Sequence, residues 1–120
     1  MKSYILLLFL VSINLGCSQK KLKAITEVSQ EEMKKVVLLD VRTPEEFDAG
    51  HLPNAININW FDSNFQQQIK EVVAKDKPVY VYCKVGGRSA KAAQKLEALG
   101  YKVTDLSGGY DAYKLAKQKK

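Results

Sequence analysis

The stretch at residues 78–89 reads Pro-Val-Tyr-Val-Tyr-Cys-Lys-Val-Gly-Gly-Arg-Ser, and the rest of the chain is interpreted outward from it. Residues 79–82 are β-branched or aromatic, which is typical of a packed strand. Cys83 follows that strand, and two glycines then precede an alanine-rich segment that favours a helix. Backbone N–H groups at such a turn and helix start lack intrahelical partners. We therefore expect residues 83–88, the Cys83 loop, to surround a thiol and to bind an anion.

Two cations belong to the Cys83 loop. Lys84 follows the cysteine directly, and Arg88 follows the two glycines. Positive charge and N–H dipoles near a cysteine favour the thiolate, which is the nucleophilic form. The alternative is an inert, buried structural cysteine. The position of Cys83 between a strand and a glycine-rich turn argues against that alternative.

Length and composition indicate one globular domain. The chain has 120 residues, of which 46% are hydrophobic and 27% charged, and its net charge is +6. Lysines are concentrated near both ends of the expected domain, where solvated tails account for them. Since no binding motif or set of aromatic residues accompanies them, we expect no nucleic-acid partner. We also expect a monomer.

The N-terminal residues have the pattern of a targeting segment. Lys2 precedes the apolar run at 5–11, which is too short for a membrane-spanning helix of roughly 20 residues but suits a signal peptide. The run at 15–17, Leu-Gly-Cys, resembles the lipidation motif of bacterial lipoproteins, although Asn14 stands where that motif usually has leucine. An ordinary cleaved signal peptide is the alternative.

From this pattern we predict a lipoprotein-type signal peptide at residues 1–16, lipidation of Cys17 and a polar tether over 17–22. The protein is then expected to be exported to the cell envelope, either anchored to a membrane by its N-terminal lipid or periplasmic. A lipidated Cys17 leaves Cys83 without a disulfide partner, because the chain has two cysteines. An unpaired thiol in an oxidising compartment indicates reactivity.

Patterns typical of strands and helices alternate along the remaining chain. Further strands are expected at 23–28, 36–41, 55–58 and 103–106. Helices are expected after the capping residues Ser29, Thr43 and Asp62 or Ser63, over residues 89–99, and at the C-terminus, where the turn at 107–110 leads into a helix that includes Tyr110. This alternation predicts an α/β fold: a single three-layer domain over 23–117 with a central, mainly parallel five-stranded sheet flanked by helices. The C-terminal edge of such a sheet would bring together the strand ends at Asp40, Cys83 and Leu106.

Asp40 stands near the end of the apolar run 36–41, which indicates a strand buried on both faces. A buried carboxylate must be paired or hydrogen-bonded. Arg42 is close to it in sequence, and Arg88 is a second candidate partner that the fold would have to bring near. We interpret Asp40 as a scaffold residue, with Arg42 in a supporting role.

Three segments are similar to the rhodanese-like sulfurtransferase family. Residues 38–58 resemble the first signature of that family, 83–101 resemble its active-site loop and following helix, and 106–110 resemble its closing Gly-Gly-aromatic segment. The departures are small: Asn54 stands where glycine is commoner, and Tyr110 where tryptophan or an aliphatic residue is common.

The resemblance implies a rhodanese-like fold and sulfur transfer without a cofactor or metal. Cys83 would attack the outer sulfur of a small anionic donor such as thiosulfate, become a persulfide, and pass the sulfur to a thiol or cyanide acceptor with ping-pong kinetics. His51, the single histidine, belongs to a turn of the family pattern and is not its general base. The implied active-site loop consists of Lys84, Val85, Gly86, Gly87 and Arg88, followed by Ser89, which would start and cap the helix.

Two alternatives remain open at this stage. Cysteine-dependent phosphatases and arsenate reductases on the same fold place five residues between cysteine and arginine, whereas four residues separate Cys83 from Arg88. The shorter loop should be too small for a tetrahedral oxyanion. The second alternative is a non-enzymatic sulfur carrier or interaction module.

Overall fold

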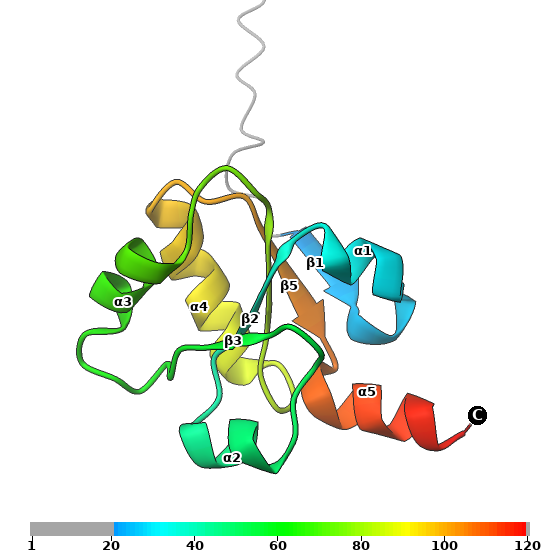
Figure 1. Ribbon diagram of the computed structural model, residues 1–120. Helices are drawn as coiled ribbons and strands as arrows, with labels where there is room; N and C mark the ends of the chain where they lie inside the picture. Colours follow the sequence, from blue (N-terminus) through cyan, green and yellow to red (C-terminus); the bar gives the residue numbers. More distant parts are fainter. Residues whose placement is uncertain (1–20, 120) are drawn as a thin grey trace, which may run out of the picture.

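Parallel strands form the centre of the computed structural model, which describes residues 21–119 (Figure 1). Within those residues, five strands pair in the order β1-β5-β4-β2-β3. Their bounds are β1 Lys21–Ala24, β2 Val37–Asp40, β3 Ile56–Asn57, β4 Val79–Tyr82 and β5 Val103–Ser107. Every pair in the sheet is parallel. The prediction of a mainly parallel, five-stranded α/β fold is therefore confirmed.

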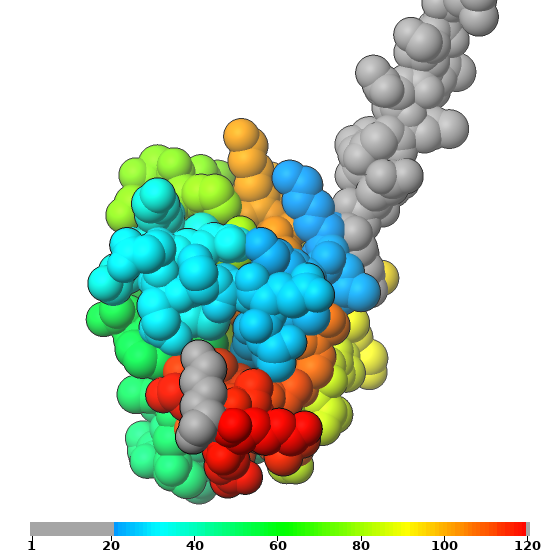
Figure 2. Space-filling view, turned by 90° about the vertical axis from the view of Figure 1, so that its right-hand side faces the viewer, coloured from blue at the N-terminus to red at the C-terminus, as the bar shows by residue number. Residues whose placement is uncertain are grey.

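Helices cover both faces of this sheet. They are η2 Ile25–Glu27, which is a short 3₁₀ turn, α1 Gln30–Lys34, α2 Pro44–Ala49, α3 Phe65–Val72, α4 Gly87–Ala98 and α5 Gly109–Gln118. Figure 1 shows α3 and α4 on one side, with α1 and α5 on the other. In Figure 2 the cyan α1 and the red α5 face the viewer. The long connections that carry these helices are what parallel strand pairing requires.

Successive side chains of β4 point to opposite faces of the sheet and pack into two separate core clusters. Val79 and Val81 point to the α3 and α4 side, where they join the apolar residues of those helices. Tyr82 points to the opposite side and packs with residues of η2, α1 and α5, and Tyr80 lies against the same cluster. This is the two-residue side-chain period of a strand that is covered on both faces. Because β4 is the middle strand, both clusters fix the position at which Cys83 leaves the sheet.

The N-terminal edge of the domain differs from the prediction. Lys21 and Leu22 belong to β1 and pair with β5, so the predicted tether over 17–22 is wrong at these two residues. Residues 25–27 form a 3₁₀ turn in place of the second half of the strand expected at 23–28. The local sequence does not reveal this edge strand because its register is set by β5, far away in the chain.

The predicted signal peptide and Cys17 lie outside the described residues. None of the helices described between residues 21 and 119 combines the length and the apolar character that crossing a membrane requires.

The helix start predicted from local sequence is confirmed for α2, whereas the one predicted for α4 is wrong. At α2, Thr43 Oγ1 accepts the Glu46 N–H (3.3 Å) and Glu46 Oε1 accepts the Thr43 N–H (3.2 Å), which completes a capping box. Helix α4 begins at Gly87, two residues before the predicted start, and no side chain caps it. Its N-cap is Gly86, whose φ of +131° suits a residue without a Cβ.

Candidate active site

The Cys83 loop lies at the C-terminal edge of the sheet, between the ends of β2 and β5. Tyr82, the last residue of β4, is in register with Asp40 of β2. The start of α5 holds the loop from the other side, because Tyr110 donates its backbone N–H to the Cys83 carbonyl (2.8 Å) and Asp111 donates to the Lys84 carbonyl (3.1 Å). The fold therefore brings together the strand ends that the sequence predicted to meet.

Close packing of the β5–α5 turn fixes this arrangement. Gly109 has a φ of +63°, and a Cβ added there would lie 2.6 Å from the Cys83 carbonyl oxygen and closer still to that of Lys84. A larger residue would therefore push the start of α5 away from the Cys83 loop.

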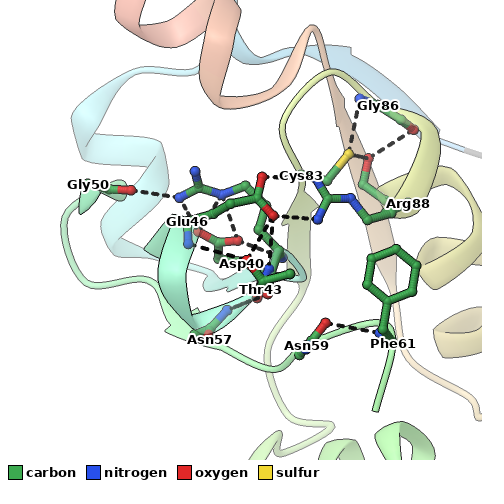
Figure 3. A network of polar contacts seen from close by, with 12 residues as sticks. Asp40, Thr43, Glu46, Gly50, Asn57, Asn59, Phe61, Cys83, Gly86 and Arg88 are labelled. Atoms are coloured by element: carbon green, nitrogen blue, oxygen red, sulfur yellow. Dashed lines mark hydrogen bonds and ion pairs between the residues drawn. The ribbon is translucent and has the colours of Figure 1, made fainter. Parts of the chain in front are cut away.

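The Cys83 sulfur is buried and hydrogen-bonded within its own loop. Its residue is 1% exposed, and Sγ accepts the backbone N–H of Gly86 at 3.0 Å (Figure 3). The thiol donates to Ser89 Oγ at 3.5 Å, and the Ser89 hydroxyl in turn donates to the Gly86 carbonyl at 3.2 Å. The prediction that Ser89 caps the helix is wrong: it is the third residue of α4 and contacts the sulfur instead.

Arg88 is bound to Glu46, a residue of α2 that is 42 positions away. Arg88 Nη1 donates to Glu46 Oε1 (2.7 Å) and Nη2 donates to Oε2 (3.0 Å), a two-pronged pair that Figure 3 displays. These hydrogen bonds lower the pKa of Glu46 to about 2. The ring of Phe61 lies 5.7 Å from the guanidinium. The idea that Arg88 pairs with Asp40 is therefore wrong, because the capping glutamate of α2 occupies its guanidinium.

Asp40 pairs with Arg42, the candidate nearest in sequence. Both are buried, and Arg42 Nη2 donates to Asp40 Oδ2 at 2.7 Å while the Arg42 backbone N–H donates to Oδ1 at 2.9 Å. Arg42 Nη2 also donates to the Gly50 carbonyl (2.7 Å), and its guanidinium lies 4.4 Å from the Tyr110 ring centroid. This pair links β2, the turn after α2 and the start of α5, as expected of a scaffold.

Lys84 is bound to a carboxylate of α5. Its Nζ donates to Asp111 Oδ2 at 2.8 Å on the protein surface, and this hydrogen bond lowers the pKa of Asp111. A cavity of about 210 Å³ lies beside this pair, between α2 and α5. Its lining residues are Arg42, Glu46, Ala49, Lys84, Tyr110, Asp111 and Lys114.

Sequence reasoning missed the roles of Glu46 and Asp111. The capping box identified Glu46 as a helix-start residue, but nothing local indicates that the same carboxylate reaches Arg88.

Val85 lies in the Cys83 loop, as predicted, and is exposed to solvent. His51 is also exposed, and its ring contacts Phe47. Among residues 21–119, no cluster of three or more histidine, cysteine or acidic side chains is arranged to hold a metal.

A family model described as "Rhodanese-like domain" matches residues 24–116. The chain therefore belongs to the rhodanese-like sulfurtransferase family. This agrees with the resemblance found in the sequence and with the parallel sheet described above.

Individual relatives support this assignment. The chain is 38% identical over 85 residues to thiosulfate sulfurtransferase 16, chloroplastic, of Arabidopsis thaliana. The matched region covers 62% of this chain and 71% of that protein. It is 39% identical over 94 residues to the uncharacterized protein YqhL of Bacillus subtilis, and this match covers 77% of this chain and 72% of YqhL. The adenylyltransferase and sulfurtransferase UBA4 of Candida albicans is 42% identical over 87 residues, which cover 67% of this chain but only 20% of that protein. The chain thus spans about a fifth of that longer relative.

Solved structures share the fold. A rhodanese-related protein from Thermoplasma volcanium has a TM-score of 0.70 and 30% identity, covering 79% of this chain and 91% of that one. A rhodanese-like domain protein from Staphylococcus aureus has a TM-score of 0.68 and 30% identity, covering 78% and 90%.

Proposed function

We propose that this protein is a sulfurtransferase that moves sulfane sulfur from a small anionic donor such as thiosulfate to a thiol or cyanide acceptor. The observation that carries the proposal is the Cys83 sulfur, which accepts the Gly86 N–H (3.0 Å) inside a loop at the start of α4. The similarity to a thiosulfate sulfurtransferase of Arabidopsis thaliana supports it. Cys83 is the proposed nucleophile and carrier of the sulfur.

The proposed reaction consists of two displacements at sulfur. In the first, the Cys83 thiolate attacks the outer sulfur of thiosulfate; the S–S bond of the donor breaks, sulfite leaves with the electron pair, and a cysteine persulfide anion remains. In the second, an acceptor thiolate or cyanide attacks the terminal sulfur. This step forms an organic persulfide or thiocyanate and restores the Cys83 thiolate, so no oxidant or reductant is consumed.

The loop supplies the groups that this chemistry needs. The first N–H groups of a helix have no intrahelical partners, and α4 has no side-chain cap. These groups, together with the partial positive charge at the helix start, favour an anion bound beside Sγ. The Ser89 hydroxyl lies 3.5 Å from Sγ and can reverse its hydrogen bond to donate to a thiolate.

Loop length and the state of Arg88 argue against phosphatase or arsenate reductase activity. Four residues separate Cys83 from Arg88. Both terminal nitrogens of Arg88 donate to Glu46. A phosphoryl or arsenate group would therefore have to compete with this carboxylate for a two-pronged arginine contact.

Intact-protein mass after incubation with thiosulfate tests the proposal. We expect the reduced wild-type protein to gain the mass of one sulfur atom and to release one equivalent of sulfite. Cys83→Ser should do neither, and cyanide should remove the added sulfur from the wild type with formation of thiocyanate. Absence of the gain in excess donor would favour the interaction-module alternative. Hydrolysis of an aryl phosphate that depends on Cys83 would favour the phosphatase alternative.

We also propose that the protein is an exported lipoprotein, anchored through Cys17. The support is the sequence of residues 2–17 alone. In a bacterial host, we expect the full-length chain to fractionate with membranes and to incorporate labelled palmitate, and Cys17→Ser to do neither. Recovery of the wild-type chain in the cytoplasm with Met1 or Lys2 still at its N-terminus would contradict the proposal.

A further inference from the structure

Both cations of the Cys83 loop are already bound to carboxylates from other elements. Glu46 of α2 binds Arg88 through two hydrogen bonds, of 2.7 and 3.0 Å. Asp111 of α5 binds Lys84 through one of 2.8 Å. We call these two carboxylates the carboxylate clamps. They neutralise the positive charges of Lys84 and Arg88, which would otherwise attract an anion to the loop.

The surroundings of the loop are also close to neutral. Arg42 forms a buried pair with Asp40. Glu46 and Asp111 both line the cavity of about 210 Å³ beside the loop, so that a charged ligand entering it meets carboxylates as well as cations. Lys114 lines the same cavity, but it is exposed to solvent and its Nζ lies 5.3 Å from the Tyr110 ring centroid. Solvent weakens its effect on a ligand inside the loop.

The charge of the donor therefore matters to this site. A sulfane donor must approach the negative Cys83 thiolate, and a dianion is repelled about twice as strongly as a monoanion at the same distance. Loop N–H groups and the helix start supply only partial positive charge, equivalent to about half an elementary charge. With Lys84 and Arg88 neutralised, the excess repulsion of a dianion remains largely uncompensated.

We propose that Glu46 and Asp111 determine donor specificity, so that the site favours singly charged sulfane donors, such as thiosulfonates and hydropersulfides, over doubly charged thiosulfate. This inference rests on the proposed sulfurtransferase function and refines its donor class. Glu46 has the larger effect, because its pair with Arg88 is two-pronged and only partly exposed, whereas the pair of Lys84 with Asp111 is open to solvent.

Glu46→Gln is the central variant. Glutamine keeps the size of the side chain and an oxygen that accepts the Thr43 N–H, so the capping box is preserved. The variant removes the negative charge that neutralises Arg88 and one of the two oxygens that accept its hydrogen bonds. Glu45→Gln is the matched control, because Glu45 is the preceding residue of the same helix turn, carries the same charge and is exposed. Asp111→Asn tests the second clamp.

Two donors that differ by one charge provide the first measurement. Thiosulfate and methanethiosulfonate both transfer an outer sulfur, releasing sulfite and methanesulfinate respectively, with cyanide as the acceptor. The measured quantity is the ratio of kcat/KM for thiosulfate to kcat/KM for methanethiosulfonate. We expect Glu46→Gln to raise this ratio about three- to tenfold and Asp111→Asn to raise it about twofold, with Glu45→Gln unchanged. In Glu46→Gln, kcat/KM for thiosulfate should also fall more steeply with ionic strength than in the wild type.

Alkylation of Cys83 provides a second measurement that does not require sulfur transfer. Iodoacetate and iodoacetamide form the same kind of thioether with loss of iodide, but only iodoacetate is an anion. We expect the ratio of the iodoacetate rate to the iodoacetamide rate to rise in Glu46→Gln and to stay constant in Glu45→Gln.

The outcomes separate the two proposals. An unchanged alkylation ratio in Glu46→Gln would overturn the clamp inference, whatever the activity of the protein. A raised alkylation ratio in a protein that forms no persulfide would support the neutralising role of Glu46 while contradicting the sulfurtransferase function. Equal loss of both donor rates, without a change in either ratio, would assign Glu46 to holding the loop in place and would also overturn the inference.

Discussion

Cys83 combines the burial of a core residue with the hydrogen bonds of a loop residue. Its side chain belongs to the apolar cluster that includes Val81 and Ala92, yet Sγ receives the N–H of Gly86. Most of the residues that share this cluster with Cys83 are aliphatic. A second sulfur attached to Sγ would therefore extend into the loop, where the N–H groups lie.

Loss of the Asp40 carboxylate should strongly destabilise the fold, because it forms a buried ion pair with Arg42. Asp40→Ala would leave the guanidinium of Arg42 buried without a counterion, because the pair is almost fully shielded from solvent. Removing one partner of such a pair costs about 3–5 kcal/mol of unfolding free energy. Urea denaturation of the variant and the wild type measures this difference.

Asp48→Ala serves as the control for this prediction, because Asp48 is an exposed carboxylate of α2. We expect it to change the unfolding free energy by less than about 0.5 kcal/mol. A loss below about 1 kcal/mol in Asp40→Ala would contradict the prediction and would mean that Arg42 remains solvated without its partner.

At the scale of elements, α2 does more than connect two strands. Its first turn places Glu46 so that one carboxylate closes the capping box with Thr43 and also binds Arg88 of α4. The short helix thus ties the start of α4, and with it the Cys83 loop, to the end of β2. The stability of this connection depends on the ionisation of a single carboxylate.

Acid should weaken the connection between α2 and α4 in a defined pH range. The pKa of Glu46 is lowered by Arg88 from an ordinary 4.5 to about 2, so the folded state favours the ionised form. The stabilisation is complete above the ordinary value and is lost as the pH falls toward about 2. Between about pH 5 and about pH 2, the wild type should lose roughly 1–2 kcal/mol more unfolding free energy than Glu46→Gln, after allowance for solvent screening.

Urea denaturation at several pH values across this range measures the effect. Glu45→Gln should follow the wild type, because the charge that it removes is exposed. Parallel pH curves for the wild type and Glu46→Gln would show that the pair with Arg88 contributes nothing to stability.

At the scale of the whole molecule, the central position of β4 explains why the candidate site is well supported. Its valines pack on the α3 and α4 side and its tyrosines on the α1 and α5 side. The Tyr82 hydroxyl also accepts the Leu52 N–H at 3.1 Å, which fixes the turn after α2 to the same strand. The loop at the end of β4 is therefore positioned by both layers of helices, an arrangement that suits a site at the C-terminal edge of a parallel sheet.

The sequence alone determined the class of fold and the position of the loop. Strand and helix periodicities are local, and so are the capping signals at Thr43 and the glycines at 86 and 87. The partner of Asp40 could also be predicted from the sequence, because Arg42 is only two residues away. By contrast, the start of β1 at Lys21 depends on pairing with β5, and the start of α4 depends on the conformation of Gly86; neither has a local signal of comparable strength.

Only the tertiary structure decided the charge of the site. In sequence, Lys84 and Arg88 are two cations beside a cysteine, and they suggest an attractive site for a doubly charged donor. In the fold, carboxylates 27 and 42 residues away bind them. An ion pair depends on the distance between charges in space, and chain connectivity places α2 and α5 against the loop only after the sheet has formed. Local sequence therefore identifies the thiol and its loop. The packing of α2 and α5 against that loop determines the electrostatic environment of the thiol.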